Sequence, residues 1–231
     1  MTLTAHPVTV QIEISTLCNA RCVCCVEPAT LPHRLMKWEV FAKAVEFVGP
    51  ETACYLYGQG EPLLHPKLAA MVQAVKARGG TACLSTNGML LDEARREELL
   101  AAGLDRVTFS LYAAEPWLHH SLQGVDSDLV WKHFQGWVEH GPQECVVTVL
   151  MSYNLPDLPN VVRRVAECGG KSIIFHQVGF AAGHFIERAG LLHPNNIESA
   201  RAWIRDAHIE ARQRGVTIDR TYHPSLHPSL D

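Results

Sequence analysis

Two hydrophobic periods alternate along the chain. Between residues 8 and 14 apolar and polar residues take turns, which is the pattern of a strand with one buried face. Between residues 38 and 48 the apolar residues instead recur at the three- and four-residue spacing of an amphipathic helix. The two patterns then follow each other repeatedly, and glycines close several of the helical stretches. The chain therefore predicts a series of strand–helix units.

Six such units are predicted, with one short additional strand after them. Strands joined through helices run parallel with right-handed crossovers, so the expected fold is α/β, a partial (β/α)6 barrel with its helices outside. A doubly wound sheet gives a similar pattern, and the hydrophobic period does not separate the two. The expected strands are 8–14, 52–57, 81–85, 106–111, 145–151, 172–177 and 216–219, and the expected helices are 38–48, 67–77, 92–101, 126–139, 158–168 and 196–214.

Length and composition are those of one globular domain. The 231 residues are 47% hydrophobic, and we assign a single core domain to residues 1–220. Residues 221–231 contain a repeated His-Pro-Ser-Leu pattern and are expected to form a flexible C-terminal tail. The net charge of −4 predicts neither a nucleic-acid partner nor a membrane partner. The chain has no apolar run of transmembrane length and no secretion signal at its N-terminus, so a soluble cytoplasmic protein is expected.

Candidate chemistry centres on one cysteine-rich stretch. Four of the eight cysteines fall within residues 18–25, and Cys18, Cys22 and Cys25 have the spacing C-x3-C-x2-C. The stretch follows the first predicted strand, where α/β folds place their functional loops. Thiolates are the usual ligands of iron–sulfur clusters. Three of them would hold three irons of a [4Fe–4S] cluster and leave the fourth iron open to another ligand.

Other uses of these thiols stay open. A tetrahedral zinc site would use all four cysteines, but zinc sites usually pair two short Cys-x-x-Cys knuckles far apart in sequence, and the adjacent Cys24 and Cys25 suit that poorly. A disulfide is disfavoured in a chain without a secretion signal. Between Cys24 and Cys25, the C-x2-C spacing from Cys22 favours Cys25 as the third ligand, because such a loop lets two thiolates converge on one cluster.

The cysteine spacing resembles the signature of the radical S-adenosylmethionine (radical SAM) family. Four later stretches follow in the order of that family, and the resemblance covers about residues 8–180 as a core domain. The last of the four is similar to the molybdenum-cofactor cyclase branch. The stretches are Gly58-Gln59-Gly60-Glu61-Pro62, Ser85-Thr86-Asn87-Gly88, Ser110-Leu111-Tyr112 and Val149-Leu150-Met151.

This resemblance implies a [4Fe–4S] cluster whose open iron binds the amino and carboxylate groups of SAM. An electron from a low-potential donor such as flavodoxin or ferredoxin would then cleave SAM to methionine and a 5′-deoxyadenosyl radical, which abstracts hydrogen from a substrate. Many family members that modify peptides or proteins carry a cysteine-rich C-terminal extension. No cysteine follows Cys168, so a small molecule or a short peptide is the expected substrate.

The resemblance also assigns residues to SAM. Gly58, Gly60 and Glu61 belong to the loop that binds its amino group, where glycines let a ligand approach the backbone. Gln59 stands where the family usually has another glycine. Asn87 either contacts SAM or substrate or forms part of an Asn-Gly turn, and the sequence leaves both open.

The remaining assignments concern the ribose and the adenine. Ser110 is expected to contact the ribose or carboxylate of SAM, and Tyr112 shares that role or faces the substrate. Met151 packs near the adenine in the related branch, with core packing as the alternative. Cys24 replaces the aromatic residue that usually touches the adenine, and it is either a small packing group or a spare thiol. A degenerate SAM-binding member and a non-enzymatic iron–sulfur or zinc module therefore remain alternatives to an enzyme.

Overall fold

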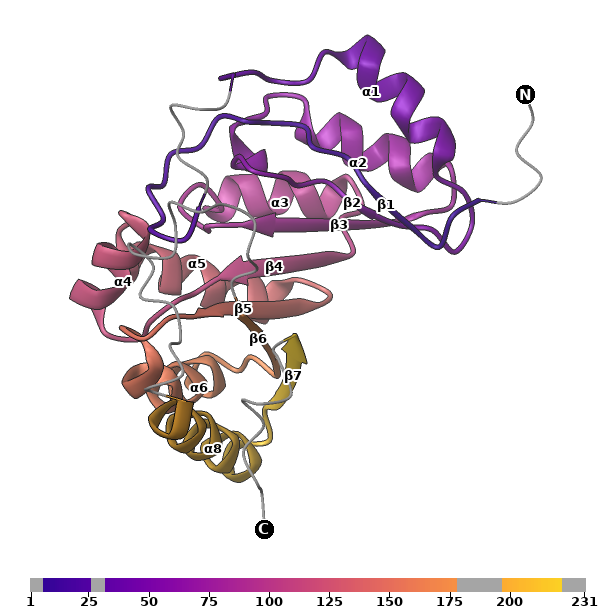
Figure 1. Cartoon of the computed structure of the whole chain (residues 1–231). Helices are drawn as coiled ribbons and strands as arrows, with labels where there is room; N and C mark the ends of the chain where they lie inside the picture. The colour runs from indigo at the N-terminus through magenta and orange to yellow at the C-terminus, as the bar shows by residue number, and fades with distance from the viewer. Residues whose placement is uncertain (1–5, 26–31, 178–196, 222–231) are drawn as a thin grey trace.

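Seven parallel strands form one sheet, and their order in space is their order in the chain, from β1 to β7. The structure is a computed structural model that describes residues 6–25, 32–177 and 197–221. Figure 1 shows β1 and β7 at opposite edges, so the sheet is open. The predicted alternation of strands and helices is confirmed, and the short last strand is present.

The elements lie close to their predicted ranges. The strands are β1 Thr9–Gln11, β2 Ala53–Tyr55, β3 Thr81–Thr86, β4 Arg106–Ser110, β5 Glu144–Leu150, β6 Ser172–Gln177 and β7 Thr217–Thr221. The α-helices are α1 Trp38–Ala44, α2 Leu68–Ala77, α3 Glu93–Ala101, α4 Pro116–Gln123, α5 Ser127–His140, α6 Leu158–Glu167 and α8 Ile197–Arg214. Short 3-10 helices span Val45–Phe47, Pro62–Leu64 and Leu155–Asp157.

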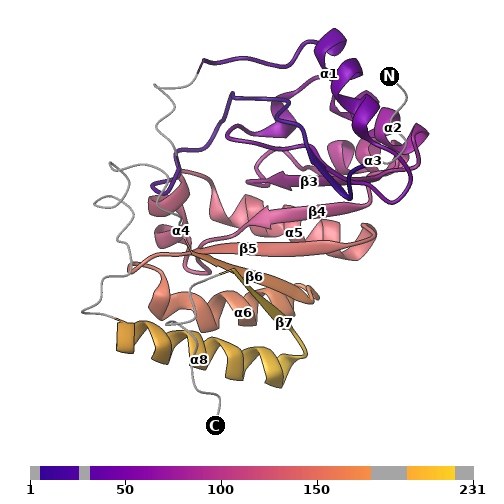
Figure 2. The same ribbon diagram turned by 45° about the vertical axis from the view of Figure 1, so that its right-hand side comes forward.

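The strand order decides between the two predicted folds. In a doubly wound sheet the order reverses at a switch point and helices cover both faces. Here each strand pairs in parallel with the next one along the chain, without a reversal. Figure 2 shows α2, α3, α5, α6 and α8 following one another around the outer side of the curved sheet. The fold is an open, partial α/β barrel, and the doubly wound alternative is wrong.

The core lies between the sheet and these outer helices. In β4, Val107 and Phe109 are buried, whereas Thr108 and Ser110 on the opposite face are partly exposed. Phe109 meets Phe134 of α5 edge to face, with ring centroids 5.2 Å apart. The alternation that predicted the strands therefore separates a buried outer face from a more polar inner face.

The first strand is shorter than its predicted range of 8–14. Beyond β1 the chain exchanges β2 for a different partner, because Met36 N donates to Ile14 O at 2.8 Å and Thr16 N donates to Arg34 O at 2.9 Å. Apolar and polar residues keep alternating up to Ser15, which bridges to Leu35 in this second pairing. Periodicity therefore gave no sign that the partner changes.

Helix α4 was not predicted, although the sequence carries its boundaries. Pro116 stands in its first turn, and Gly124 follows its last residue with a left-handed φ of 68°. Its buried residues include Leu118 and Leu122, which pack under the loops at the carboxyl end of the sheet. The helix is short, so these signals stand beside only two turns of hydrophobic pattern.

The inner face of the sheet borders a cavity of about 580 Å³. Residues from β2 to β7 line it, and Tyr57, Ser85 and Thr108 bring hydroxyl groups to its wall. His176, near the end of β6, is also among the lining residues. The cavity therefore offers polar groups to a bound molecule and extends from the loop after β2 to the amino ends of β4, β5 and β6, where Arg106, Glu144 and Ser172 line it.

The predicted tail and the predicted domain boundary are the next two features. Residues 222–231 of the predicted tail lie outside the described residues, and the assignment of one domain to residues 1–220 stays a prediction. Within residues 6–25, 32–177 and 197–221, the structure contains no helix with both the length and the apolar character needed to cross a bilayer.

Candidate functional site

The cysteine loop leaves β1 at the carboxyl edge of the sheet and lies against the end of α4. Arg21 N donates to Gln123 O at 2.8 Å, and Val23 N donates to Leu122 O at 2.9 Å. Cys22 stands between these two bonds, so the end of α4 fixes its backbone. In Figure 1, α4 lies at the left end of the sheet, the end toward which the arrows of β3 and β4 point.

The thiols of the predicted ligands are neighbours and are not joined by disulfides. Cys18 is exposed, and Cys22 and Cys25 are partly buried. Burial raises the pKa of the Cys22 thiol, and the nearby thiols of Cys24, Cys25 and Cys18 raise it further, because thiolates so close together repel one another. A bound cation reverses this repulsion, since metal-coordinating thiols are deprotonated. The donor set thus fits a positively charged metal centre that several thiolates share.

Local backbone bonds shape the loop around these thiols. Cys25 N donates to Cys22 O at 3.1 Å, which closes a tight turn across the C-x2-C spacing. Ala20 N donates to Cys18 Sγ at 3.4 Å. In the part of the chain that the structure describes, no three His, Cys, Asp or Glu side chains surround a position for a single metal ion.

Three of the predicted SAM contacts come together beside the cysteine loop. Tyr112 and Met151 are buried in a small apolar cluster at the ends of β4 and β5, and Cys24 packs against it. The Cys24 thiol also lies within hydrogen-bonding reach of the Tyr112 hydroxyl. Burial raises the pKa of Cys24 to about 11. Packing as a small group, one of the two interpretations of Cys24, is what this arrangement supports.

Asn154 ties together the two strand ends that carry this cluster. Its Nδ2 donates to Tyr112 O at 2.8 Å and to Val149 O at 2.8 Å. Its Oδ1 accepts from Met151 N at 2.9 Å. The buried amide therefore fixes the chain on both sides of the predicted adenine contacts.

Two glycines after β2 allow other parts of the protein to pack closely against their backbone. A Cβ on Gly60 would lie 2.4 Å from Ser15 O and 2.5 Å from Leu17 O, the backbone that leads into the cysteine loop. A Cβ on Gly58 would lie 2.3 Å from Glu13 Oε1, and that carboxylate accepts from Gln59 N at 2.6 Å. Glycine is needed at both positions for packing between loops, and a SAM contact there stays a prediction.

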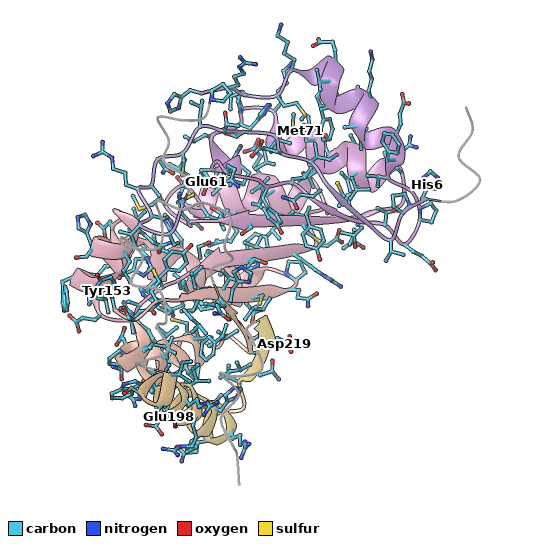
Figure 3. All side chains as sticks on the ribbon, viewed as in Figure 1. His6, Glu61, Met71, Tyr153, Glu198 and Asp219 are labelled. Carbon is cyan, nitrogen blue, oxygen red and sulfur yellow. The ribbon has the colours of Figure 1, made fainter. Side chains whose placement is uncertain are left out.

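Glu61 joins the loop after β2 to the end of β3. Its side chain is buried, and Oε1 accepts from Leu63 N at 3.0 Å and from Thr86 Oγ1 at 2.8 Å. Oε2 accepts from Asn87 N at 2.8 Å. Burial raises the pKa of this carboxyl group to about 7, against the lowering effect of the three donors. Figure 3 labels Glu61 on the side of the sheet where the cysteine loop and α4 lie.

Asn87 continues this connection to the cysteine loop. Its Nδ2 donates to Asn19 Oδ1 at 2.8 Å, and its Oδ1 accepts from Met89 N at 3.0 Å, as in an Asx-turn. The amide also lowers the pKa of the Cys18 thiol by hydrogen bonding, although burial raises it overall. Asn87 therefore forms the Asx-turn and braces the first cysteine, and its contact with SAM or substrate stays a prediction.

Ser110 differs from these residues because its hydroxyl has no hydrogen-bonding partner among the described residues. It ends β4, half-buried on the inner face of the sheet, and pairs in register with Val147. Its hydroxyl is available to a ligand.

Sequence reasoning missed Glu13, Asn19 and Gln123. The sequence carried one signal for Glu13, which is an acidic residue at a polar position of the predicted strand 8–14.

Comparison with known proteins assigns the family. The family model of the Radical SAM superfamily matches residues 12–165, two thirds of the chain. The chain belongs to the radical SAM superfamily. Among its relatives is the tungsten-containing aldehyde ferredoxin oxidoreductase cofactor-modifying protein of Pyrococcus furiosus, 32% identical over 170 residues that cover 68% of this chain and 48% of the relative. The PqqA peptide cyclase of Ruegeria pomeroyi is 27% identical over 215 residues, covering 91% and 57%.

Solved structures share the fold of this radical SAM protein. Streptococcus suis SuiB bound to S-adenosylmethionine superposes with a TM-score of 0.73 at 16% identity, over 95% of this chain and 52% of that one. Native anSMEcpe with bound AdoMet gives a TM-score of 0.73 at 16% identity, over 94% and 64%. The chain spans about half the length of the curated relatives it matches. These matches confirm the partial barrel.

Glu61 makes stability depend on pH. Its carboxyl pKa is about 7 when folded, against an ordinary value of 4.5, so between these values the folded chain keeps a proton that the unfolded chain has lost. The stability that protonated Glu61 contributes is complete below the lower value and is lost as pH rises through the higher one, by about 3 kcal/mol. Urea unfolding from about pH 5 to about pH 8 should show this fall, and Glu61→Gln should lack it. Identical pH profiles for the two proteins would contradict the assignment.

Gly60→Ala should disturb the cysteine loop as well as the loop after β2 that contains Gly60. The added methyl group meets backbone oxygens of Ser15 and Leu17, which must move, and Cys18 moves with them. We expect less iron per chain after anaerobic reconstitution and weaker SAM binding, measured by iron analysis and calorimetry. The matched control is Gly136→Ala on α5, whose methyl group meets only the flexible end of Arg96 within 3 Å. Normal iron content in Gly60→Ala would show that the two loops are independent.

Proposed function

We propose that this chain is a radical SAM enzyme that binds a [4Fe–4S] cluster through Cys18, Cys22 and Cys25. The observation that carries the proposal is the grouping of these three thiols on one loop at the carboxyl edge of a radical SAM fold. Membership of the superfamily also favours a cluster over the zinc site and over a purely structural module. The cluster would supply the electron that cleaves SAM to methionine and a 5′-deoxyadenosyl radical, which removes hydrogen from the substrate.

The other predicted residues would position SAM around the open iron. We assign the backbone of Gly58 and Gly60 to its amino group, with Glu61 holding that loop in place. Ser110 has a free hydroxyl among the described residues and is suited to the ribose or carboxylate. Tyr112 and Met151 offer the apolar surface that an adenine needs.

Cys24 and Asn87 contact residues that would themselves bind SAM or the cluster. Cys24 packs with this apolar cluster, and its sulfur lies where it accepts from the Tyr112 hydroxyl, so it would orient that ring. Asn87 connects the end of β3 to Asn19 beside the first cysteine. Both residues would therefore position ligand-binding groups without reacting themselves.

The inner cavity is the proposed substrate site. It begins at Tyr57, next to the glycine loop, and its hydroxyl groups suit a polar substrate. A peptide or a small molecule is supported by the relatives, which include the PqqA peptide cyclase, GTP 3′,8-cyclases and SuiB bound to the precursor peptide SuiA. We also propose a low-potential donor such as flavodoxin or ferredoxin and a cytoplasmic location, and we assign no nucleic-acid or membrane partner.

The cysteine assignment is tested by single Cys→Ala variants. Replacing Cys18, Cys22 or Cys25 removes one of three thiolates, so each variant should lose the brown cluster absorbance and all production of 5′-deoxyadenosine under strong reductant. Cys24→Ala should keep the cluster and change SAM affinity only modestly. Cys168→Ala is the control and should behave as wild type, because Cys168 is the C-cap of α6 and follows the last turn of that helix, before β6.

Three results would contradict the proposal. A colourless wild-type protein that retains zinc after anaerobic reconstitution would favour the structural module. A brown Cys25→Ala together with a colourless Cys24→Ala would show that the third ligand is wrongly assigned. A brown wild type that binds SAM and releases no 5′-deoxyadenosine would identify a degenerate family member.

A further inference from the structure

The side chain of Gln123 is a buried amide without a normal partner. Gln123 is the last residue of α4 and is 0% exposed. Neither its Nε2 nor its Oε1 completes a hydrogen bond of ordinary geometry with any residue that the structure describes. Burying an amide without partners costs on the order of 1–3 kcal/mol, and most buried polar groups in native proteins are satisfied. An amide in this position therefore points to a hydrogen bond that is completed only when the neighbouring site holds its ligand.

The surroundings of this amide are the cysteine loop. Gln123 O accepts from Arg21 N at 2.8 Å, and the preceding carbonyl accepts from Val23 N at 2.9 Å. These bonds hold Cys22 directly opposite the end of α4. The Gln123 side chain lies beside the Cys22 thiol, where its hydrogen-bonding effect opposes the larger effect of burial on the thiol pKa. Backbone and side chain of Gln123 thus both face the same cluster ligand.

We propose that Gln123 Nε2 donates a hydrogen bond to the sulfur of Cys22 when the cluster is bound and thereby raises the reduction potential of the cluster. The inference rests on the proposed function only in requiring the cluster. Reduction adds one negative charge to a centre surrounded by thiolates, and an amide N–H directed at a ligand sulfur stabilises the more negative state. Gln123 is therefore a positioning and tuning residue that does not touch the substrate.

The test is the midpoint potential of the reconstituted full chain without SAM, from a redox titration followed by electron paramagnetic resonance. Gln123→Leu and Gln123→Met remove the donor while keeping an apolar side chain of similar size. In both, the reduction equilibrium should become about tenfold less favourable, a shift of about 59 mV to lower potential for one electron. Gln135→Leu on α5, where the exposed side chain donates to Glu139, is the matched control and should not shift.

The outcomes separate this inference from the proposed function. A wild-type protein that holds no cluster would overturn the proposed function. A loaded wild type with unchanged potentials in both Gln123 variants would overturn only the hydrogen bond to Cys22. Loss of the cluster in both variants would also overturn it, because Gln123 would then serve to hold the loop. Full cluster loading with lower potentials in both variants would establish it.

Discussion

Backbone hydrogen bonds from two distant parts of the chain hold the cysteine loop in place. On one side Glu61 N donates to Leu17 O at 2.7 Å, and on the other side Arg21 N donates to Gln123 O at 2.8 Å. A short loop cannot fix three thiols by itself, because ordering each backbone residue costs about 1–2 kcal/mol. The position of the thiols therefore depends on the glycine loop and on α4. The open parallel sheet brings both of these to the same edge.

The same network connects the cysteine loop to the loop after β2, which is predicted to bind SAM. Glu61 receives donors from its own loop and from the end of β3, and Asn87 carries the connection on to Asn19. The raised pKa of Glu61 shows what its burial costs the ionised carboxyl group. Gly60 packs directly on the backbone before Cys18, so the two loops fit together as one body. A change in one loop is thus transmitted to the other.

Local signals predicted the parts of the site that are continuous in sequence. The cysteine spacing, the glycine loop and the strand ends at Ser110 and Met151 all stand where periodicity and the family resemblance placed them. Three features were missed: two arise from tertiary contacts, and α4 is too short for its hydrophobic pattern to predict it. The strand β1 exchanges one partner for another without a change of period, α4 presents only two turns, and the amide of Gln123 gains its meaning only when α4 meets Cys22.

The central claim is a cluster held by three thiolates with one iron left for SAM. Mössbauer spectroscopy of the full chain, reconstituted with isotopically enriched iron, tests it most directly, because each iron contributes separately to the spectrum. Addition of SAM should shift the signal of about one quarter of the iron and leave the rest in place. A spectrum that SAM does not change, or one that shows all irons equivalent with and without SAM, would contradict the account.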